Sequence, residues 1–375
     1  MVFYVSEGNE LVVTEVLIQQ IAYQSLQKFM QERPFVLFGS GTSCAVDTRF
    51  GMSALRDHIV TVMSSVELSD IAQSQWEKVV RLLEAECDLE SAMNEVQDED
   101  LIHRVINVTA DFIASLNWEY SLKIRSGEMV WPALALFERL VAGLSMNNAL
   151  HVATTNYDLL AEYSLEHAKI PYITGFCGGI GRSLDWKTAS RMVVCCEGVN
   201  HGKKMKQVPK YAKHIRLYKV HGSLNTFRIN NEIIENNEWI YNKPDTIERM
   251  IITPGTNKHE RIQQNRAELL GEYDRAVASH SAFLFIGFGF NDSQLSNDAI
   301  IRKLKDQECP GLIMTRDSNT RIERIIDGCK NVWLICKPED NSGTRIRNGR
   351  FNDPLLIEND ELWNPCIFVE KILGR

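Results

Sequence analysis

Short apolar runs that end in glycine or in polar residues are the feature of this sequence that most constrains its fold. Most of these runs are continuously apolar rather than alternating, and they occupy residues 35–38, 149–154, 215–220, 250–253, 282–286, 311–315 and 332–336. Strands that are apolar on both sides are typical of a parallel sheet covered by helices on both faces. Helical patterns separate the runs. The sequence therefore predicts an α/β fold with a doubly wound, mostly parallel, Rossmann-like sheet.

The spacing of the runs predicts one domain over 1–375 that carries two insertions. Residues 54–148 repeat apolar side chains at helical spacing, as in Trp76, Val79 and Leu83. This stretch is too long for one crossover, so we expect a helical insertion that covers a ligand site or forms an oligomer interface. Residues 159–214 form a second variable insertion. We expect the Lys-rich segment 197–213 and the polar segment 338–353 to be surface loops.

Composition excludes several classes of protein. The formal net charge of −8 does not indicate the basic surface that binds nucleic acid, so we expect no direct binding of nucleic acid. No apolar run reaches the roughly 20 residues of a membrane helix, and the N-terminus lacks a signal-peptide pattern. We therefore expect a cytoplasmic protein without membrane contact. The nine cysteines are odd in number and contain no Cys-x-x-Cys pair, which favours reduced thiols and no zinc or other metal site.

Four loops that follow predicted strands hold the candidate site residues. Ligands of an open parallel sheet bind beyond the carboxyl ends of its strands, so these loops are expected to meet. Small residues let backbone amides approach a diphosphate, and histidine suits proton transfer near neutral pH. Taken singly, each loop has a structural alternative: a tight glycine turn, or a helix cap in the case of Asp158. The four loops hold Gly39, Ser40, Gly41, Thr42 and Ser43; Thr155, Asn156 and Asp158; His221; and Gly287, Gly289 and Asn291.

In this order the four loops resemble the motifs of the sirtuin superfamily. The run 39–43 is similar to the sirtuin Gly-Ala-Gly-x-Ser loop, and 155–158 is similar to the Gln-Asn-x-Asp motif beside the nicotinamide ribose. His221-Gly222 resembles the His-Gly that supplies the sirtuin base, and 287–289 resembles the late glycine motif that holds a ribose. The matched motifs span 35–292, although most of the intervening sequence is not matched.

Two departures separate the chain from the sirtuin deacetylases. Deacetylases carry two Cys-x-x-Cys pairs in a zinc module after the histidine, whereas residues 224–250 contain no cysteine. The Asp-Phe-Arg motif after the first loop is also missing. The zinc module helps to build the groove for an acyl-lysine peptide, so its loss argues against peptide deacylation.

The chain instead resembles the sirtuin-like effectors of bacterial anti-phage defence. That resemblance implies an NAD⁺ hydrolase that releases nicotinamide and ADP-ribose and depletes NAD⁺. Asn156 is then expected to orient the ribose and a water, His221 to act as base, and Asp158 to hold a ribose hydroxyl or stabilise the developing cation. The first loop and Thr155 are expected to bind the diphosphate and ribose, and Gly287, Gly289 and Asn291 the adenosine half. The resemblance also implies a homo-oligomer and a separate activating partner, such as a HerA-type hexameric ATPase.

Three other functions stay open at the level of sequence. The chain can be an NAD-dependent protein deacylase, which an acyl-lysine assay distinguishes from a hydrolase. It can be a non-catalytic sensor of NAD⁺ or ADP-ribose, which binds without turnover. An ordinary dehydrogenase is disfavoured. Its dinucleotide-binding motif would place an acidic residue at the end of a second strand, about 20 positions after the glycine loop, and no such residue is clear here. The sequence does not separate NAD⁺ from NADP⁺, and it does not fix how the catalytic roles divide among Asn156, Asp158 and His221.

Overall fold

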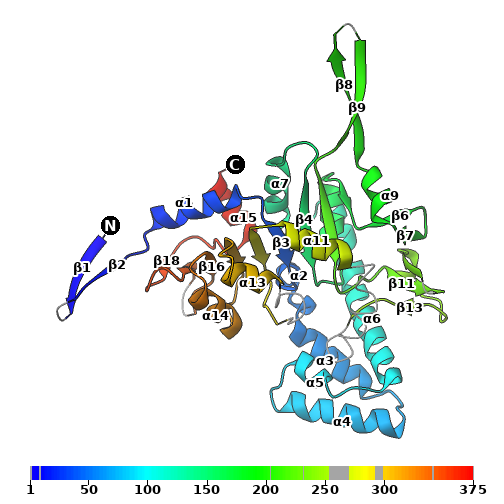
Figure 1. The fold of residues 1–375 in the computed structure, drawn as a ribbon. Helices are drawn as coiled ribbons and strands as arrows, with labels where there is room; N and C mark the ends of the chain where they lie inside the picture. The colour runs from blue at the N-terminus through cyan, green and yellow to red at the C-terminus, as the bar shows by residue number, and fades with distance from the viewer. Residues whose placement is uncertain are drawn as a thin grey trace.

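A nine-stranded sheet forms the centre of the molecule (Figure 1). The structure is a computed structural model that describes residues 2–7, 10–202, 204–230, 232–252, 270–291, 299–339 and 342–374. The sheet has the order β18-β17-β16-β15-β14-β3-β4-β10-β5. Its strands are β3 (Phe35–Phe38), β4 (Ala149–Thr154), β5 (Tyr172–Ile173), β10 (His214–Lys219), β14 (Phe283–Ile286), β15 (Gly311–Met314), β16 (Val332–Cys336), β17 (Thr344–Asn348) and β18 (Leu355–Ile357).

The strands from β16 to β5 are all parallel, and only β17 and β18 run antiparallel at one edge. From β3 the chain proceeds to β4 and β10 on one side, and it later returns to β14 on the other side of β3. The gap between β3 and β14 is therefore the point where the strand order reverses, and dinucleotides bind at such a point in doubly wound sheets. The predicted fold class is confirmed.

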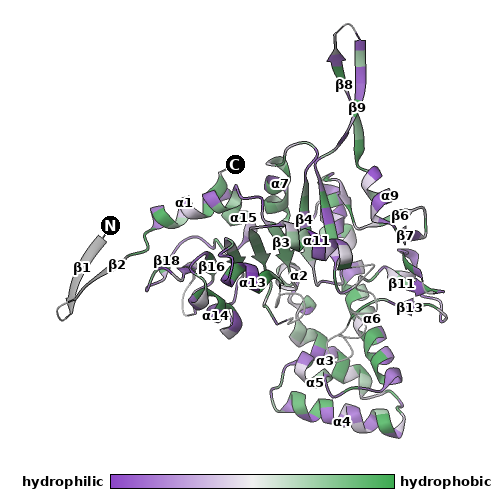
Figure 2. Cartoon of the chain, viewed as in Figure 1, coloured by the Kyte–Doolittle hydropathy of each residue, from purple (hydrophilic) through white to green (hydrophobic). Residues whose placement is uncertain are grey.

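Helices cover both faces of this sheet, which explains why its central strands are apolar throughout. All four residues of β3 are buried, with Val36 and Phe38 in one core cluster and Phe35 and Leu37 in the other. The first face is covered by α1 (Gln19–Met30), α7 (Leu134–Ala142), α8 (Leu160–His167) and α15 (Pro365–Phe368). The second face is covered by α11 (Gly271–Ser279), α13 (Ala299–Lys305) and α14 (Thr320–Gly328). Figure 2 shows the apolar strands enclosed by helices of mixed polarity.

The helical stretch between β3 and β4 forms a lobe at the end of the molecule opposite the long hairpin (Figure 1). After α2 (Gly41–Cys44) and the short helix η1 (Thr48–Phe50), it contains α3 (Met52–Met63), α4 (Asp70–Glu84), α5 (Leu89–Met93) and α6 (Glu99–Arg125). The side chains of Ser69, Asp88 and Asp98 each accept a backbone hydrogen bond at the start of a helix, as N-cap residues do. The last helix of the stretch, α7, packs beside β4.

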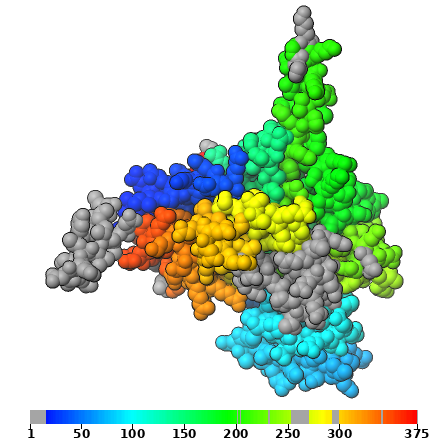
Figure 3. Space-filling view, viewed as in Figure 1, coloured from blue at the N-terminus to red at the C-terminus, as the bar shows by residue number. Residues whose placement is uncertain are grey.

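The chain between β4 and β14 builds two smaller β structures. β6 (Phe176–Gly178) and β7 (Arg182–Leu184) join β11 (Thr226–Ile229), β12 (Glu232–Glu235) and β13 (Glu248–Arg249) in an antiparallel sheet. After α9 (Trp186–Arg191), β8 (Val194–His201) and β9 (Lys204–Tyr211) form a hairpin that projects from the body (Figures 1 and 3). The N-terminal strands β1 (Val2–Glu7) and β2 (Glu10–Glu15) form another hairpin, and the short helices η2 (Glu238–Ile240) and η4 (Val369–Leu373) complete the described chain.

Three local predictions were wrong. The Lys-rich segment 197–213 is mostly the β8–β9 hairpin rather than a loop. The polar segment 338–353 contains β17, where Thr344 and Ile346 are fully buried. Residues 250–252 form no strand, and the remainder of that predicted strand, residue 253, lies outside the described residues. Among the described residues, no helix is long and apolar enough to cross a membrane.

Candidate functional site

A pocket of about 210 Å³ lies beyond the carboxyl ends of β3, β4, β10 and β14. All four loops that the sequence singled out contribute to it. The predicted residues that line the pocket are Gly39, Ser40, Thr155, Asn156, Asp158, His221, Gly287, Gly289 and Asn291. Gly41, Thr42 and Ser43 do not line it. They form α2 behind the pocket wall, where Thr42 and Ser43 are buried.

The two glycine loops contact each other through their backbones. The Gly41 amide donates a hydrogen bond of 3.0 Å to the Gly287 carbonyl. A Cβ atom at Gly41 would lie 2.7 Å from the Gly287 Cα, and one at Gly39 would lie 2.8 Å from the Gly287 oxygen. Gly287 also has a φ of 55°, which favours glycine. These glycines are therefore needed to join the loops after β3 and β14, before any ligand is considered.

Asn156 connects the first glycine loop to the loop after β4. Its Nδ2 donates to the Gly39 carbonyl at 3.1 Å and to the Ser43 hydroxyl at 2.9 Å. Because a carbonyl oxygen only accepts, these contacts fix the orientation of the amide. The Oδ1 atom of Asn156 is buried and has no hydrogen-bond partner among the described residues. A buried acceptor without a donor is costly, so this atom is suited to accept from a ligand hydroxyl or a water.

Both carboxylate oxygens of Asp158 already have protein partners. Oδ2 accepts from the Ser43 hydroxyl at 2.8 Å, and Oδ1 accepts from the Leu160 amide at 3.1 Å. The second contact lies at the start of α8, which is the helix-end role that sequence analysis weighed for this residue. Asp158 therefore ties α2 to α8 at the wall of the pocket.

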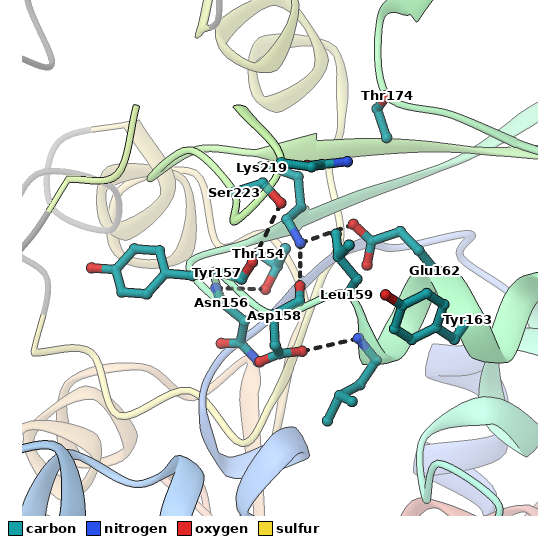
Figure 4. A network of polar contacts seen from close by, with 12 residues as sticks. Thr154, Asn156, Tyr157, Asp158, Leu159, Glu162, Tyr163, Thr174, Lys219 and Ser223 are labelled. Carbon is teal, nitrogen blue, oxygen red and sulfur yellow. Dashed lines mark hydrogen bonds and ion pairs between the residues drawn. The ribbon is translucent and has the colours of Figure 1, made fainter. Parts of the chain in front are cut away.

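A buried ion pair supports the loop after β4 from behind (Figure 4). The Lys219 Nζ donates to the backbone carbonyl of Asp158 at 2.5 Å and to Oε1 of Glu162 at 2.8 Å. The two side chains are only 7% and 8% exposed. Burial raises the pKa of Glu162, while Lys219 opposes that shift. Lys219 is the last residue of β10 and lies two residues before His221. The end of β10 therefore leads into the His221 loop and also supports the loop of Asn156 and Asp158.

A second buried carboxylate, Glu235, lies on β12 of the small sheet. It pairs with Arg182 at 3.1 Å and accepts from Thr174 at 3.4 Å. Burial raises its pKa to about 7, against the opposing effect of Arg182. The sequence pattern alone does not reveal Lys219, Glu162 or Glu235 as paired residues, because each lies far along the chain from its partner.

The loop that carries His221 is fixed by close backbone contacts. His221 is 6% exposed, and its carbonyl accepts from the Ile252 amide at 2.9 Å. Gly222 has a φ of 76°, and a Cβ atom there would lie 1.6 Å from the Met250 carbonyl oxygen. The Tyr157 hydroxyl donates to the Ile252 carbonyl at 2.5 Å. Residues 250–252 thus connect the His221 loop to the loop of Asn156.

Helices of the insertion cover the open side of the pocket. Met52 and Leu55 of α3, Leu89 and Glu90 of α5 and Ile113 of α6 line it. Helical spacing in the sequence identifies the apolar face of each helix, but it does not identify the loops which that face covers. The stretch 54–148 therefore contributes directly to the candidate site.

The turn before α3 brings a further aromatic residue, Phe50, into the pocket wall. Arg49 pairs with Asp47 at 2.6 Å and with Glu119 of α6 at 2.8 Å. The hydrogen bond from Arg49 lowers the pKa of Asp47 to about 2. This network fixes η1 against α6.

The described residues contain no group of three or more His, Cys, Asp or Glu side chains placed to hold a metal ion. The nine cysteines are all free thiols, and Cys195 and Cys196 are exposed on β8.

Comparison with known proteins gives a match for the central part of the chain. A search of the curated proteins found no match. The match to the SIR2-like domain family extends from β4 into α14 and includes Asn156, His221 and Gly287, whereas the first glycine loop precedes it. Domains of this family are typically NAD-using enzymes. Residues 150–324, slightly less than half of the chain, match the family model of the SIR2-like domain.

Proposed function

We propose that the protein is an NAD⁺ hydrolase that cleaves the bond between nicotinamide and ribose. The observation that carries the proposal is the unpartnered Oδ1 of Asn156, buried in a pocket that also contains His221. A buried acceptor in the same pocket as a potential base suits the positioning of a water or a ribose hydroxyl. The supporting facts are the strand reversal between β3 and β14 and the match to the SIR2-like domain.

In the proposed reaction a water oxygen forms a bond to the anomeric carbon as the carbon–nitrogen bond breaks. The bonding electron pair moves to the pyridinium nitrogen, so nicotinamide leaves neutral and needs no protonation. His221 accepts the proton that the water loses, and the products are ADP-ribose, nicotinamide and a proton. The transition state carries positive charge on the ribose, so interactions formed there accelerate the reaction most. Asn156 orients the water or the ribose through Oδ1.

The other candidate residues divide into two roles. Gly39, Ser40, Thr155, Gly289 and Asn291 line the pocket and are proposed to contact the diphosphate and ribose units. A second group joins the loops that follow β3, β4 and β14, and it consists of Gly41, Thr42, Ser43 and Gly287. Asp158 belongs with this second group, since its oxygens already bind Ser43 and Leu160. We therefore propose that Asp158 positions the loop rather than holding a ribose hydroxyl.

Water is the proposed acceptor, rather than an acyl-lysine peptide. Residues 224–250 contain no cysteine and form β11, β12 and β13. They therefore offer no Cys-x-x-Cys pairs for the zinc module that helps deacetylases to bind a peptide. An assay with NAD⁺ and an acyl-lysine peptide tests this choice: peptide-independent release of nicotinamide is expected.

The catalytic assignment is tested with His221→Ala and Asn156→Ala. We expect each change to lower nicotinamide release by about 10²–10⁴-fold, which is the usual cost of losing a general base or a polar positioning group. Binding of NAD⁺ should survive in His221→Ala, because the glycine loops are intact. His103→Ala is the matched control, since His103 is exposed on α6 and is remote from the pocket. Near-normal turnover in both site variants, with unchanged melting temperatures, would contradict the proposal.

The resemblance to defence effectors extends the proposal to the cell. We propose that the protein acts in the cytoplasm as a homo-oligomer, that a separate partner such as a HerA-type ATPase activates it, and that depletion of NAD⁺ limits phage growth. Cellular NAD⁺ should then fall after infection in cells that carry the chain and its partner. The level should remain constant in cells that carry the His221→Ala variant.

A further inference from the structure

A second and larger cavity, of about 980 Å³, lies at the amino ends of the parallel strands, whereas the candidate site lies at their carboxyl ends. It is lined by the first residues of β4 and β10 and by the ends of α1 and α7. Three arginines and three histidines line it, and no aspartate or glutamate does so among the described residues. These six residues are Arg33, Arg139, Arg216, His151, His214 and His280. In a chain with a net charge of −8, such a concentration of cationic groups requires an explanation.

The three guanidinium groups retain unused hydrogen-bond donors. Arg33 has neither a hydrogen bond nor an ion pair with another described residue, although its backbone is held at a φ of 52°. Arg139 makes one long contact, of 3.4 Å, with the Leu373 carbonyl. Arg216 pairs with Glu272 at 3.1 Å, yet its Nε is buried without a partner in the described part of the chain. A left-handed non-glycine residue and a buried orphan donor are both features that accumulate at ligand sites.

Neutralisation of helix ends does not account for these arginines. Helices α7 and α11 end near this cavity, and cations stabilise the carboxyl ends of helices. Other groups already serve that purpose: the Lys213 Nζ donates to the Ala142 carbonyl of α7, and the Lys303 Nζ donates to the Ala278 carbonyl of α11. The guanidinium groups of Arg33 and Arg139 are therefore available to a ligand.

The histidines shape the cavity and add little charge at neutral pH. His214 donates through Nδ1 to the Ala212 carbonyl at 2.8 Å, and His280 donates through Nδ1 to the Ala276 carbonyl at 2.7 Å. These contacts fix the tautomer of each neutral ring and leave Nε2 as an acceptor. Burial lowers the pKa of His214 and of His280. The arginines therefore supply the charge, and the rings supply polar contacts.

We propose that this cavity binds an organic phosphate of about the size of a nucleotide. Guanidinium groups bind phosphate oxygens through paired hydrogen bonds, and they do so more specifically than lysine. The volume lies within the range of small-molecule sites, roughly 300–1,000 Å³. Apolar side chains complete the wall for the organic part, among them Met30, Leu144 and Ile372. The site is separate from the pocket of Asn156, so the inference does not depend on NAD⁺ cleavage.

The test is calorimetric titration of the full chain with two probes, inorganic pyrophosphate and ATP. We expect both to bind, and we expect the double variant Arg33→Gln/Arg139→Gln to weaken both by at least about tenfold, because two charge-assisted contacts are lost. Both side chains are at the surface, so the variant should fold normally. The matched control is Arg81→Gln/Arg104→Gln, which removes the same charge from α4 and α6, far from the cavity.

Three outcomes would overturn the proposal. The first is absence of binding of both probes at millimolar concentration. The second is equal affinity in wild type and the Arg33→Gln/Arg139→Gln variant, which is also the result expected if pyrophosphate binds only at the glycine loops. The third is an equal loss in the variant and in the Arg81→Gln/Arg104→Gln control, which would indicate a response to net charge alone.

Discussion

At the scale of single residues, the glycines of the site differ in what they do. Gly222 cannot accept a side chain, because a Cβ atom would lie 1.6 Å from the Met250 oxygen and its φ is positive. At Gly289 the nearest atoms to a Cβ would be 3.5 Å away, which is ordinary contact. Gly222 is therefore required by the fold, as are Gly39, Gly41 and Gly287, whereas the fold leaves room for a side chain at Gly289.

Gly222→Ala should lower the free energy of unfolding by at least about 1–3 kcal/mol, the usual cost of a strained backbone conformation. The clash with residue 250 adds to this cost, because backbone atoms must move. Urea denaturation followed by circular dichroism measures the effect. Gly289→Ala is the matched control and should change stability by less than about 1 kcal/mol. Equal stability of the two variants would show that the contact with Met250 does not constrain the loop.

Lys219→Met should be among the most destabilising single changes near the site. It leaves the Glu162 carboxylate buried without its partner and removes the donor to the Asp158 carbonyl. Breaking a buried ion pair from one side typically costs about 3–5 kcal/mol. The double variant Lys219→Met/Glu162→Leu should recover part of that loss, because no buried charge remains unpaired. Additive effects of the two changes, measured by a double-mutant cycle, would contradict this account.

At the scale of elements, the β8–β9 hairpin is distinct from the rest of the fold. In the described part of the chain its two strands pair only with each other, and all of their described side chains are exposed or half-buried. A two-stranded hairpin without a packed face is only marginally stable in water. The hairpin should therefore open independently of the central sheet.

Limited proteolysis tests the independence of the hairpin. Trypsin should cleave first after Lys204, Lys206 and Lys210, because hydrogen bonds that hold these residues are exposed to water. Cleavage after Lys219, which is buried at the end of β10, should follow only on global unfolding. Replacement of 195–210 by Asn-Gly, which favours a tight hairpin turn between the paired residues Val194 and Tyr211, should change the melting temperature by less than about 3 °C. Early cleavage after Lys219 would show that the core opens with the hairpin.

The sequence predicted the strands of the sheet interior and failed at its margins, for a physical reason. The interior strands β3, β4, β10, β14, β15 and β16 are buried on both faces, so their apolar runs are unmistakable. β17 has only one aliphatic residue, Ile346, and the side chains of Arg345 and Arg347 pair with Glu323 on α14. β8 and β9 carry no apolar period, since no other described element covers their faces. A strand leaves no hydrophobic signal when its buried face is mostly polar, as in β17, or when neither face is buried, as in the described residues of β8 and β9.

The candidate site also has parts that the sequence predicted and parts that it did not. Its loops could be predicted because each follows an apolar strand, and parallel strands bring their carboxyl ends to one edge. The residues that were missed act across long separations in sequence, as Lys219 does with Glu162. The helices over the pocket were expected as an insertion that covers a ligand site or forms an oligomer interface. Which of their residues line the pocket of Asn156 and His221 depends on packing that spacing alone does not encode.

At the scale of the whole molecule, the two edges of the central sheet have different chemistry. The carboxyl edge carries the glycine loops, Asn156 and His221. The amino edge carries a cluster of histidines around His151, whose Nδ1 lies 2.9 Å from the Tyr218 hydroxyl and whose ring lies 4.8 Å from that of His280. Burial lowers the pKa of His151 to about 3, and the neighbouring His280 contributes to the shift. The amino edge is therefore the acid-sensitive part of the fold.

This difference gives a dependence of stability on pH whose sign is fixed. Above pH 6.5, the ordinary pKa of a histidine side chain, His151 is neutral in both states and contributes nothing. Between that value and about 3 the unfolded chain binds a proton that the folded chain does not. The free energy of unfolding therefore decreases as the pH is lowered through this range. His151→Phe, which keeps a ring of similar size, should remove this effect at a constant cost from the lost Tyr218 contact. Relative to the variant, wild type should lose up to about 2–3 kcal/mol between pH 6.5 and 4.5.

The comparison between wild type and His151→Phe is needed because other groups act in the opposite direction. Glu235 has a raised pKa of about 7, so the folded chain retains a proton above pH 4.5 that the unfolded chain releases, and its contribution weakens the fold as pH rises. That contribution is the same in both proteins and cancels in the difference. His103→Phe is the control, because it makes the same substitution at a half-exposed histidine on α6, outside the cluster around His151. A difference between wild type and His151→Phe that is constant from pH 7 to 4.5 would mean that His151 protonates as readily in the folded chain as in the unfolded one.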